Sequence, residues 1–217
     1  MFNRKYIFES KQTRSKRFIR NIALILLSST TAYLLLCLYL PIYAEKENEK
    51  TNLAFFKKSP DLIAVYTGDS GRLDYTFKKI EKYPSSKVFI SGVYAKNNLK
   101  ILLNKQGTDL SVDDFLNQES HHIELDYLAR NTVENSIATL NYLRQLDGHL
   151  NILIISSDYH ILRISLILET LKSETDDYNF YFESIPKDYS QTRNLKKLFK
   201  EVYKLIRTTG FLAFWND

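Results

Sequence analysis

The sequence predicts an α/β domain, in which a mainly parallel sheet lies between two layers of helices, preceded by one apolar N-terminal helix. Two observations predict the domain: short apolar runs typical of buried strands alternate with segments of helical apolar periodicity, and each run stops at small polar residues. A third observation predicts the helix, because Ile22 to Ile42 is almost wholly apolar and has no charged residue. Such an alternation favours a Rossmann-like, three-layer arrangement.

The N-terminal part of the chain divides into a basic tail, an apolar segment and a linker. Residues 1–20 carry seven basic side chains against one acidic side chain, a net charge of +6, whereas the whole chain has +5. Residues 21–43 are long enough to cross a bilayer, which takes roughly 20 residues. By the positive-inside rule the tail stays in the cytoplasm and the C-terminal domain lies on the opposite side. Residues 44–60 begin with a charged run and predict a solvated linker to a domain over 61–217.

Composition argues against several classes of function. The apolar segment exceeds the roughly 7–15 residues of a signal-peptide core, and Ile42-Tyr43-Ala44 is a poor cleavage site, so we favour an uncleaved anchor over a signal peptide. The only cysteine, Cys37, lies in this segment and leaves the domain without a disulfide or a thiol nucleophile. From Asn21 onward the chain is close to neutral, with 23 basic and 24 acidic residues, so a nucleic-acid-binding face is not expected.

The predicted strands follow from their apolar, β-branched composition. They cover Leu62–Tyr66, Val88–Ile90, the weaker Ile123–Leu125, and Ile152–Ile155. A fifth strand over Asn179–Ile185 alternates apolar and polar residues, which is typical of an edge strand.

Helices are predicted between these strands. One reaches about Lys82 and another runs from Asn131 to about Leu146. A third follows the strand that ends at Ile155, with good N-cap residues at its start, namely Ser156, Ser157 and Asp158. The closing helix is expected to bury one apolar face, formed by Leu195, Leu198, Phe199, Val202, Leu205 and Ile206.

Residues 93–122 show no clear pattern of strand or helix. A structureless loop of this length is uncommon in a compact domain. We therefore expect short helices near Leu99–Leu103 and Val112–Asn117, placed to form a lid.

Two polar motifs follow the first two strands. In the run from Thr67 to Arg72, Gly68 and Gly71 allow a tight turn and close approach of a ligand, and Arg72 adds positive charge for an anion. A simple turn between strand and helix is the alternative. Ser91-Gly92 ends the second strand at the same edge of the sheet, and an ordinary turn is again the alternative.

A third motif, Asn131-Thr132-Val133-Glu134-Asn135, begins a helix. Asn131 and Glu134 have the spacing of a capping box, so a purely structural role is the alternative to ligand contact for these two residues. Thr132 and Asn135 are three apart and share one helix face. They are candidates for ligand contact.

The fourth motif, Ser157-Asp158-Tyr159-His160 with Arg163, is the most informative. The helical pattern that follows the strand places His160 and Arg163 on the first turn of a helix, beyond the carboxyl end of a strand, where ligands bind in open α/β sheets. Their spacing lets them address one ligand together. His160 is either a general base or a neutral hydrogen-bond partner whose pKa is lowered by the helix N-terminus. Arg163 suits bidentate contact with phosphate or carboxylate.

Several specific chemistries lack their sequence pattern. Neither a G-x-G-x-x-G fingerprint nor a P-loop is present, so no nucleotide class is indicated. His121 and His122 are adjacent and His149 lies in a turn, and without metal-ligand spacing no metal site is predicted. A serine triad would combine Ser91 or Ser157 with His160 and with Asp69 or Asp158. The nucleophile-elbow pattern G-x-S-x-G is absent.

Taken together, the four motifs resemble the YdcF-like family, typified by YdcF, SanA and ElyC and known as domain of unknown function 218. The resemblance covers roughly residues 61–210 in the right order and includes a vaguer E-x-x-K pair, Glu201 and Lys204. The chain departs from the family's pattern at Asp69 and Val93, where many relatives have glycine. A carboxylate at position 69 would repel an anion bound close to that turn.

The resemblance implies a Rossmann-like fold and a role in the bacterial cell envelope. Membrane-anchored relatives are linked to envelope integrity and to peptidoglycan or lipid-carrier metabolism, and a soluble relative to S-adenosylmethionine binding. It thus implies a single-pass inner-membrane protein with its N-terminus in the cytoplasm and its domain in the periplasm. The family's reaction chemistry is unsettled and indicates no cofactor.

We therefore expect a domain that binds, and in one version processes, an anionic envelope precursor such as a lipid-linked or sugar phosphate. His160 would be the acid/base group, and the ligand contacts would come from Gly68, Asp69, Arg72, Ser91, Gly92, Asn131, Thr132, Asn135, Ser157 and Arg163. One alternative is a non-catalytic sensor or scaffold, whose envelope-assembly partners would contact residues 93–122 or the aromatic C-terminus (Phe211, Phe214 and Trp215). Another alternative is a nucleotide- or S-adenosylmethionine-binding domain.

Overall fold

The computed structural model describes residues 11–94, 122–146 and 148–214, which form parts of two compact units, Met1–Tyr39 and Leu40–Asp217. The short helices expected near 99–103 and 112–117 lie outside the described residues. The first element is α1 (Lys11–Ala54), a 44-residue helix. By length and composition, it is the one described helix long and apolar enough to cross a membrane.

The second unit is built on a five-stranded, all-parallel sheet. Its strands are β1 (Leu62–Tyr66), β2 (Lys87–Ser91), β3 (Ile123–Leu125), β4 (Leu150–Ser157) and β5 (Tyr178–Ile185), in the order β3-β2-β1-β4-β5. The predicted parallel sheet and the edge position of the last strand are confirmed. The order is that of the first five strands of a doubly wound sheet, in which the chain turns back at the boundary between β1 and β4.

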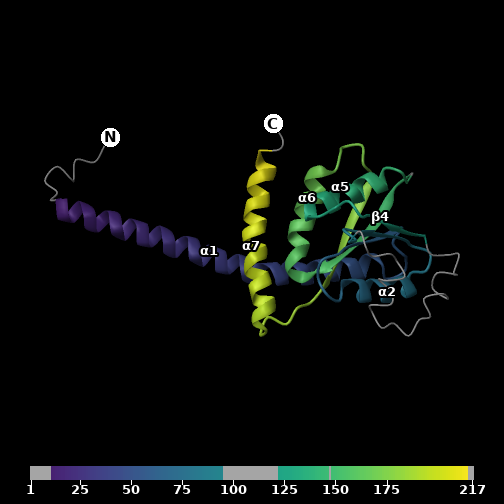
Figure 1. Cartoon of the computed structure of the whole chain (residues 1–217), viewed down its shortest axis with the longest axis horizontal. Helices are drawn as coiled ribbons and strands as arrows, with labels where there is room; N and C mark the ends of the chain where they lie inside the picture. Colours follow the sequence, from purple (N-terminus) through teal and green to yellow (C-terminus); the bar gives the residue numbers. More distant parts are fainter. Residues whose placement is uncertain (1–10, 95–121, 147, 215–217) are drawn as a thin grey trace. The chain divides into compact units, whose positions relative to one another are not determined.

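Helices cover both faces of this sheet (Figure 1). On one face, α2 (Arg72–Lys82) packs through Phe77 and Ile80 against apolar side chains of β1, β2 and β4. On the other face, α5 (Thr132–Leu143) and α6 (Ile161–Leu171) pack against the alternate side chains of the same strands. The central strands are buried on both faces, which explains their unbroken apolar sequence. The last helix, α7 (Thr192–Ala213), lies beside α6 (Figure 1).

The predicted linker 44–60 is corrected over its first part, because α1 continues as far as Ala54. Two polar side chains of this helix bond the backbone of the edge strand β5. The Asn48 Oδ1 atom accepts from the Ser184 N–H at 2.6 Å, and the Thr51 hydroxyl donates to the Phe182 carbonyl at 2.7 Å. An edge strand carries backbone groups that no neighbouring strand satisfies. The helix supplies partners for them, and the segment is therefore structural.

The apolar face predicted for the closing helix is also corrected. Leu198, Val202 and Leu205 are buried as expected, but Leu195 and Ile206 are 39% and 51% exposed, and Phe199 is 37% exposed. Glu201, only 3% exposed, is buried in their place. The helix turns this carboxylate inward because it bonds His160 and Arg163 of the α6 region.

Candidate ligand-binding site

A cavity of about 380 Å³ lies at the carboxyl ends of β1 and β4, where the strand order reverses. This is the position at which open α/β sheets bind ligands. Four separate segments line it: the turn after β1, the start of α5, the segment after β4, and α7. Its lining residues are Thr67, Gly68, Asp69, Arg72, Arg130, Asn131, Thr132, Asn135, Tyr159, His160, Arg163, Lys197, Lys200, Glu201, Lys204 and Arg207.

Most of the residues predicted for the site line this cavity. They are Gly68, Asp69, Arg72, Asn131, Thr132, Asn135, His160 and Arg163. Ser91, Gly92 and Ser157 are not part of the lining. Ser91 and Ser157 are fully buried, and their hydroxyls donate to carboxylates, Asp126 at 2.8 Å and Asp69 at 3.1 Å. These two serines therefore do not face the cavity; they hydrogen-bond residues in or next to its wall.

The junction after β4 differs from the predicted helix start. The strand extends through Ser157, a 3₁₀ turn covers Asp158–His160, and α6 begins only at Ile161. The Ser157 side chain forms no cap, and His160 is the N-cap residue of α6 rather than part of its first turn. Asp158 instead holds the connection to α7, because it accepts from the Lys187 N–H at 2.9 Å and the Tyr189 hydroxyl at 2.7 Å.

His160 is held by a carboxylate of α7. Its Nδ1 atom lies 2.6 Å from Glu201 Oε1, a distance that requires an N–H between them. The neutral ring then has its free lone pair on Nε2, which lies 3.3 Å from the Thr132 hydroxyl. Burial lowers the pKa of His160, against the opposing effect of the Glu201 carboxylate. The histidine is therefore a neutral acceptor at neutral pH.

Glu201 is shared between His160 and Arg163. The Arg163 Nε–H donates to the same carboxylate oxygen at 2.6 Å. Burial alone would raise the pKa of Glu201, but the contacts with His160 and Arg163 outweigh it and lower that pKa. The Nε edge of the Arg163 guanidinium is thus already bonded to Glu201. The predicted bidentate contact with a ligand is therefore not available along that edge.

Arg72 is fixed by groups at the ends of both central strands. Its Nε–H donates to the Ser157 hydroxyl at 3.1 Å and its Nη1 to the Tyr66 carbonyl at 2.9 Å. The side chain is 4% exposed, so most of its guanidinium is already used within the protein. Its charge nevertheless lies at the cavity wall.

The expected repulsion by Asp69 is offset by two lysines. Asp69 forms ion pairs with Lys197 and, at 3.3 Å, with Lys187, and it accepts from the Tyr159 hydroxyl at 2.6 Å. Burial would raise the pKa of Asp69, but these partners hold it well below its usual range. The carboxylate therefore ties α7 to the turn after β1, and its surroundings are net positive.

The end of β2 packs tightly against the same wall. Gly92 has a φ of +78°, and a Cβ atom there would lie 3.0 Å from both Asn135 Oδ1 and Thr67 Oγ1. Asp126 accepts from the Ser91 hydroxyl and from the Gly92 N–H at 3.3 Å. Ser91-Gly92 is thus a close-packed support beneath Thr67 and Asn135.

The capping alternative for Asn131 and Glu134 is confirmed. Asn131 Oδ1 accepts from the N–H groups of Val133 and Glu134 at 3.0 and 3.1 Å. Glu134 in turn accepts from Asn131 Nδ2 and from the Arg130 N–H. Asn131 also lines the cavity, so the cap positions Thr132 as the first residue of α5 at the cavity wall.

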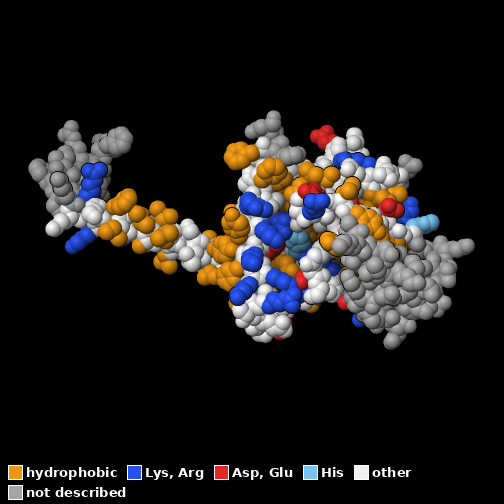
Figure 2. Space-filling model, in the orientation of Figure 1, with side chains coloured by type: hydrophobic (Ala, Val, Ile, Leu, Met, Phe, Trp, Pro, Cys, Tyr) orange, Lys and Arg blue, Asp and Glu red, His pale blue; other side chains and the backbone are white. Residues whose placement is uncertain are grey.

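Sequence reasoning did not single out the basic residues that α7 brings to the cavity. They are Lys197, Lys200 and Arg207, with Lys204, which appeared only in the vaguer E-x-x-K pair. Figure 2 shows Lys and Arg side chains gathered along this helix. Their spacing of three or four places them on one helix face, which was a usable indication. With Arg72, Arg130 and Arg163, the lining has seven basic side chains against two acidic ones.

The serine triad considered from the sequence is not formed. Neither Ser91 nor Ser157 bonds His160, and the carboxylate on His160 is Glu201 rather than Asp69 or Asp158. Asp158 faces the segment before α7 instead.

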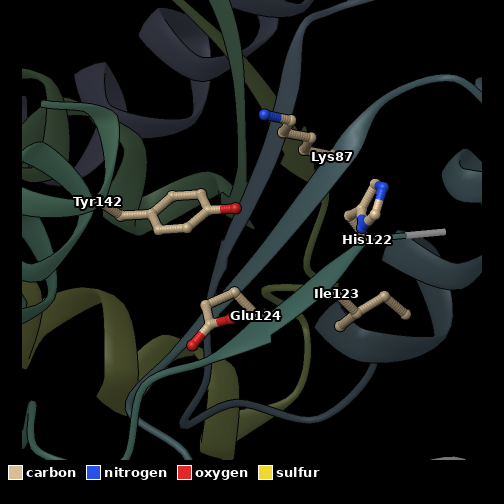
Figure 3. Close-up of a pocket in the computed structure, with 5 residues that line it drawn as sticks. All are labelled: Lys87, His122, Ile123, Glu124 and Tyr142. Atoms are coloured by element: carbon tan, nitrogen blue, oxygen red, sulfur yellow. The ribbon is translucent and has the colours of Figure 1, made fainter. Parts of the chain in front are cut away.

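A second cavity, of about 400 Å³, lies at the opposite end of the sheet. It is lined by Lys87, His122, Ile123, Glu124 and Tyr142 (Figure 3). Lys87 and Ile123 are the first residues of β2 and β3, so this cavity is at the amino ends of the strands. None of the predicted site residues lies there, and we take the cationic cavity as the candidate site.

The fold and the site together define an α/β protein with a doubly wound strand order and a cationic cavity between β1 and β4, where that order reverses. The same chain has one candidate membrane helix. No protein-family model, curated protein or solved structure matches the chain.

Proposed function

We propose that this chain is a membrane-anchored protein of the bacterial cell envelope that binds an anionic, phosphate-containing precursor in the cationic cavity. The observation that carries the proposal is the excess of basic over acidic side chains in the lining. Four basic side chains of the lining form no ion pair with a described residue, namely Arg72, Arg130, Lys200 and Arg207. Arg72 is hydrogen-bonded within the protein, so Arg130, Lys200 and Arg207 are the cations left for a ligand. Charge of this density suits phosphate groups better than a single carboxylate.

The nature of the ligand follows from the shape of the charge distribution. Lys200, Lys204 and Arg207 follow one another along α7, whereas Arg72 and Arg163 lie deeper and are buried. A sugar phosphate or a lipid-linked diphosphate would place one phosphate near the buried arginines and further negative charge along the helix. The volume of about 380 Å³ is within the range of small-molecule sites.

The cellular setting rests on the apolar helix and on the family resemblance. The charge asymmetry of the N-terminus favours a cytoplasmic tail and a periplasmic domain in the inner membrane. A reporter enzyme that is active only in the periplasm, fused after Asp217, should be active. Activity only with a cytoplasmic reporter would favour the nucleotide-binding alternative.

Binding is tested by thermal unfolding of the full chain in detergent micelles. The ligands are inorganic pyrophosphate, a polyprenyl phosphate, a sugar phosphate, ATP and S-adenosylmethionine. A ligand at 100 times its dissociation constant should stabilise the fold by about 2.7 kcal/mol, a rise in midpoint on the order of 5–10 °C. A rise with S-adenosylmethionine alone, or with none of the phosphates, would contradict the proposal.

Matched variants on α7 assign the effect to the cavity. Lys200→Glu should weaken phosphate binding about tenfold, which corresponds to about 1.4 kcal/mol. Lys196→Glu makes the same charge change at an exposed position of the same helix, outside the cavity lining. Equal losses in the two variants would indicate a general charge effect instead of a site.

A further inference from the structure

We propose that Thr132 is the nucleophile of a phosphoryl-transfer step, with His160 as its base and Glu201 as the group that orients the histidine. The inference deepens the proposed function and rests on it, because it requires a phosphate ligand in the same cavity.

The three side chains form a continuous hydrogen-bonded line. The Thr132 hydroxyl lies 3.3 Å from His160 Nε2, and His160 Nδ1 lies 2.6 Å from Glu201 Oε1. This is the order of nucleophile, base and orienting carboxylate found in activated-hydroxyl enzymes. The members come from α5, the turn after β4, and α7, so only the folded chain assembles them.

Other residues fix the positions of Thr132, His160 and Glu201. Arg163 donates to the same Glu201 oxygen at 2.6 Å and so prevents the carboxylate from turning away. The Asn131 cap fixes the start of α5 and with it the backbone of Thr132. His160 and Glu201 are 7% and 3% exposed, which keeps water from competing for their hydrogen bond.

Thr132 belongs to the wall of the cavity in which a phosphate would bind. Thr132 lines the cavity together with Arg72, Arg130 and Lys200. Positive charges around a transferring phosphoryl group stabilise its equatorial oxygens. His160 is neutral at neutral pH and has a free lone pair on Nε2. Burial lowers its pKa and so weakens it as a base, but the charged Glu201 carboxylate offsets part of this effect by stabilising the imidazolium that forms.

The step conserves atoms and charge. Thr132 Oγ1 attacks phosphorus as its proton moves to His160 Nε2, and the bond from phosphorus to the leaving oxygen breaks. The leaving oxygen keeps the bonding electrons and takes the proton from Nε2. Water then attacks the phosphothreonine and gives a proton to Nε2. The Oγ1–P bond breaks, Oγ1 keeps the bonding electrons and takes that proton from Nε2, and phosphate is released with His160 neutral again. The net reaction is hydrolysis of a phosphate ester.

The test uses a fluorophosphonate on the full chain in detergent micelles. An activated hydroxyl displaces fluoride from this probe and keeps a stable phosphonyl group, so the adduct is read by intact mass and peptide mapping. We expect one adduct per chain at Thr132, protection by inorganic pyrophosphate, and labelling roughly 100-fold slower in His160→Gln. Thr132→Ser should still be labelled, whereas the isosteric Thr132→Val should not.

Two measurements keep the outcomes distinct. Thr132→Val should still bind pyrophosphate, at most about tenfold more weakly because one hydroxyl contact is lost. Thr170→Val, the same change on α6 outside the cavity, should be labelled normally. A natural chain that binds pyrophosphate but is not labelled, or an adduct that persists in Thr132→Val, would overturn the nucleophile and leave the binding proposal intact. Absence of pyrophosphate binding would overturn both.

Discussion

At the residue scale, the His160–Glu201 pair links the chemistry of the site to the stability of the fold. Both side chains are buried and each satisfies the other. Burial keeps the histidine neutral, while the carboxylate remains charged because Arg163 and the histidine N–H compensate it. Each group therefore has a protonation state that the unfolded chain does not share over part of the pH range.

This difference predicts a loss of stability at mildly acidic pH. The pKa of His160 falls from an ordinary 6.5 to about 4, so below pH 6.5 the unfolded chain takes up a proton that the folded chain does not. The free energy of unfolding should thus decrease as the pH is lowered from 6.5 to 5.5, a range that lies above the ordinary glutamate pKa of 4.5 and so precedes the contribution of Glu201. Urea unfolding at several pH values measures this decrease. His160→Gln should flatten it, and a slope in this variant equal to that of the natural chain would refute the assignment.

Gly92 is the second residue on which the site wall depends. Its φ of +78° strains any other residue, and a Cβ atom would meet two side chains at 3.0 Å. Gly92→Ala should destabilise the fold by about 2–3 kcal/mol, since the contact adds to a backbone cost of roughly 1–2 kcal/mol.

Gly148→Ala is the matched control, because Gly148 also has a positive φ, +95°, but a Cβ atom at this position would have no neighbouring atom within 4 Å. It should show the backbone cost alone. Thermal unfolding measures both, at roughly 2–4 °C for each kcal/mol. If Gly92→Ala lowers the unfolding midpoint no more than Gly148→Ala does, the side chains of Thr67 and Asn135 can move aside without a cost in stability.

At the element scale, the last turns of α1 complete the sheet. Asn48 bonds the N–H of Ser184 at 2.6 Å and its hydroxyl at 2.9 Å, and Thr51 bonds the carbonyl of Phe182. Ala44 and Phe55 are buried in the cores on the two faces of the sheet. The helix therefore covers the open side of β5 and protects an edge that would otherwise be free to pair with another chain.

Removing one of these bonds tests the role of the helix. Asn48→Ala leaves the Ser184 N–H without its partner and should destabilise the domain by about 1–3 kcal/mol. Asn52→Ala, an exposed position one turn further along, should change stability by less than about 0.5 kcal/mol. Urea midpoints compare the two. Equal effects would show that α1 contributes only apolar contact.

At the scale of the whole molecule, the site exists only where four distant segments meet. The doubly wound order brings together the ends of β1 and β4, and α5 and α7 supply the remaining walls. Lys197 and Asp69 are 128 residues apart and form one of the ion pairs that close the cavity. The integrity of the site should therefore depend on the whole second unit.

A pair of fragments tests this dependence. Residues 40–217, the second compact unit, should unfold cooperatively and bind inorganic pyrophosphate as the full chain does. Residues 60–217 lack the helix over β5 and should unfold at least about 10 °C lower, on the scale of 2–4 °C for each kcal/mol lost. Thermal unfolding with and without pyrophosphate measures both. Equal midpoints for the two fragments would show that α1 does not contribute to the stability of the second unit.

Local patterns in the sequence determined the strands, their parallel arrangement, most of the helices and the edge where the site lies. They did so because burial on both faces leaves an unbroken apolar run, and because small polar residues stop each run at the same edge. Eight of the predicted ligand-contact and catalytic residues indeed line the cavity. The Asn131 cap was equally readable, since capping partners lie within one turn of the chain.

Only the tertiary structure decided which distant partners complete these local features. Glu201 was indicated only through the vaguer E-x-x-K pair, and its role became clear only because α7 places it against His160, 41 residues away. The segment after residue 44 looked solvated because its charges and amides are polar, yet Asn48 finds its partner on β5, 136 residues away. A sequence pattern reports neighbours within a turn or along a strand, whereas these contacts are chosen by how whole elements pack, and that choice requires the folded chain.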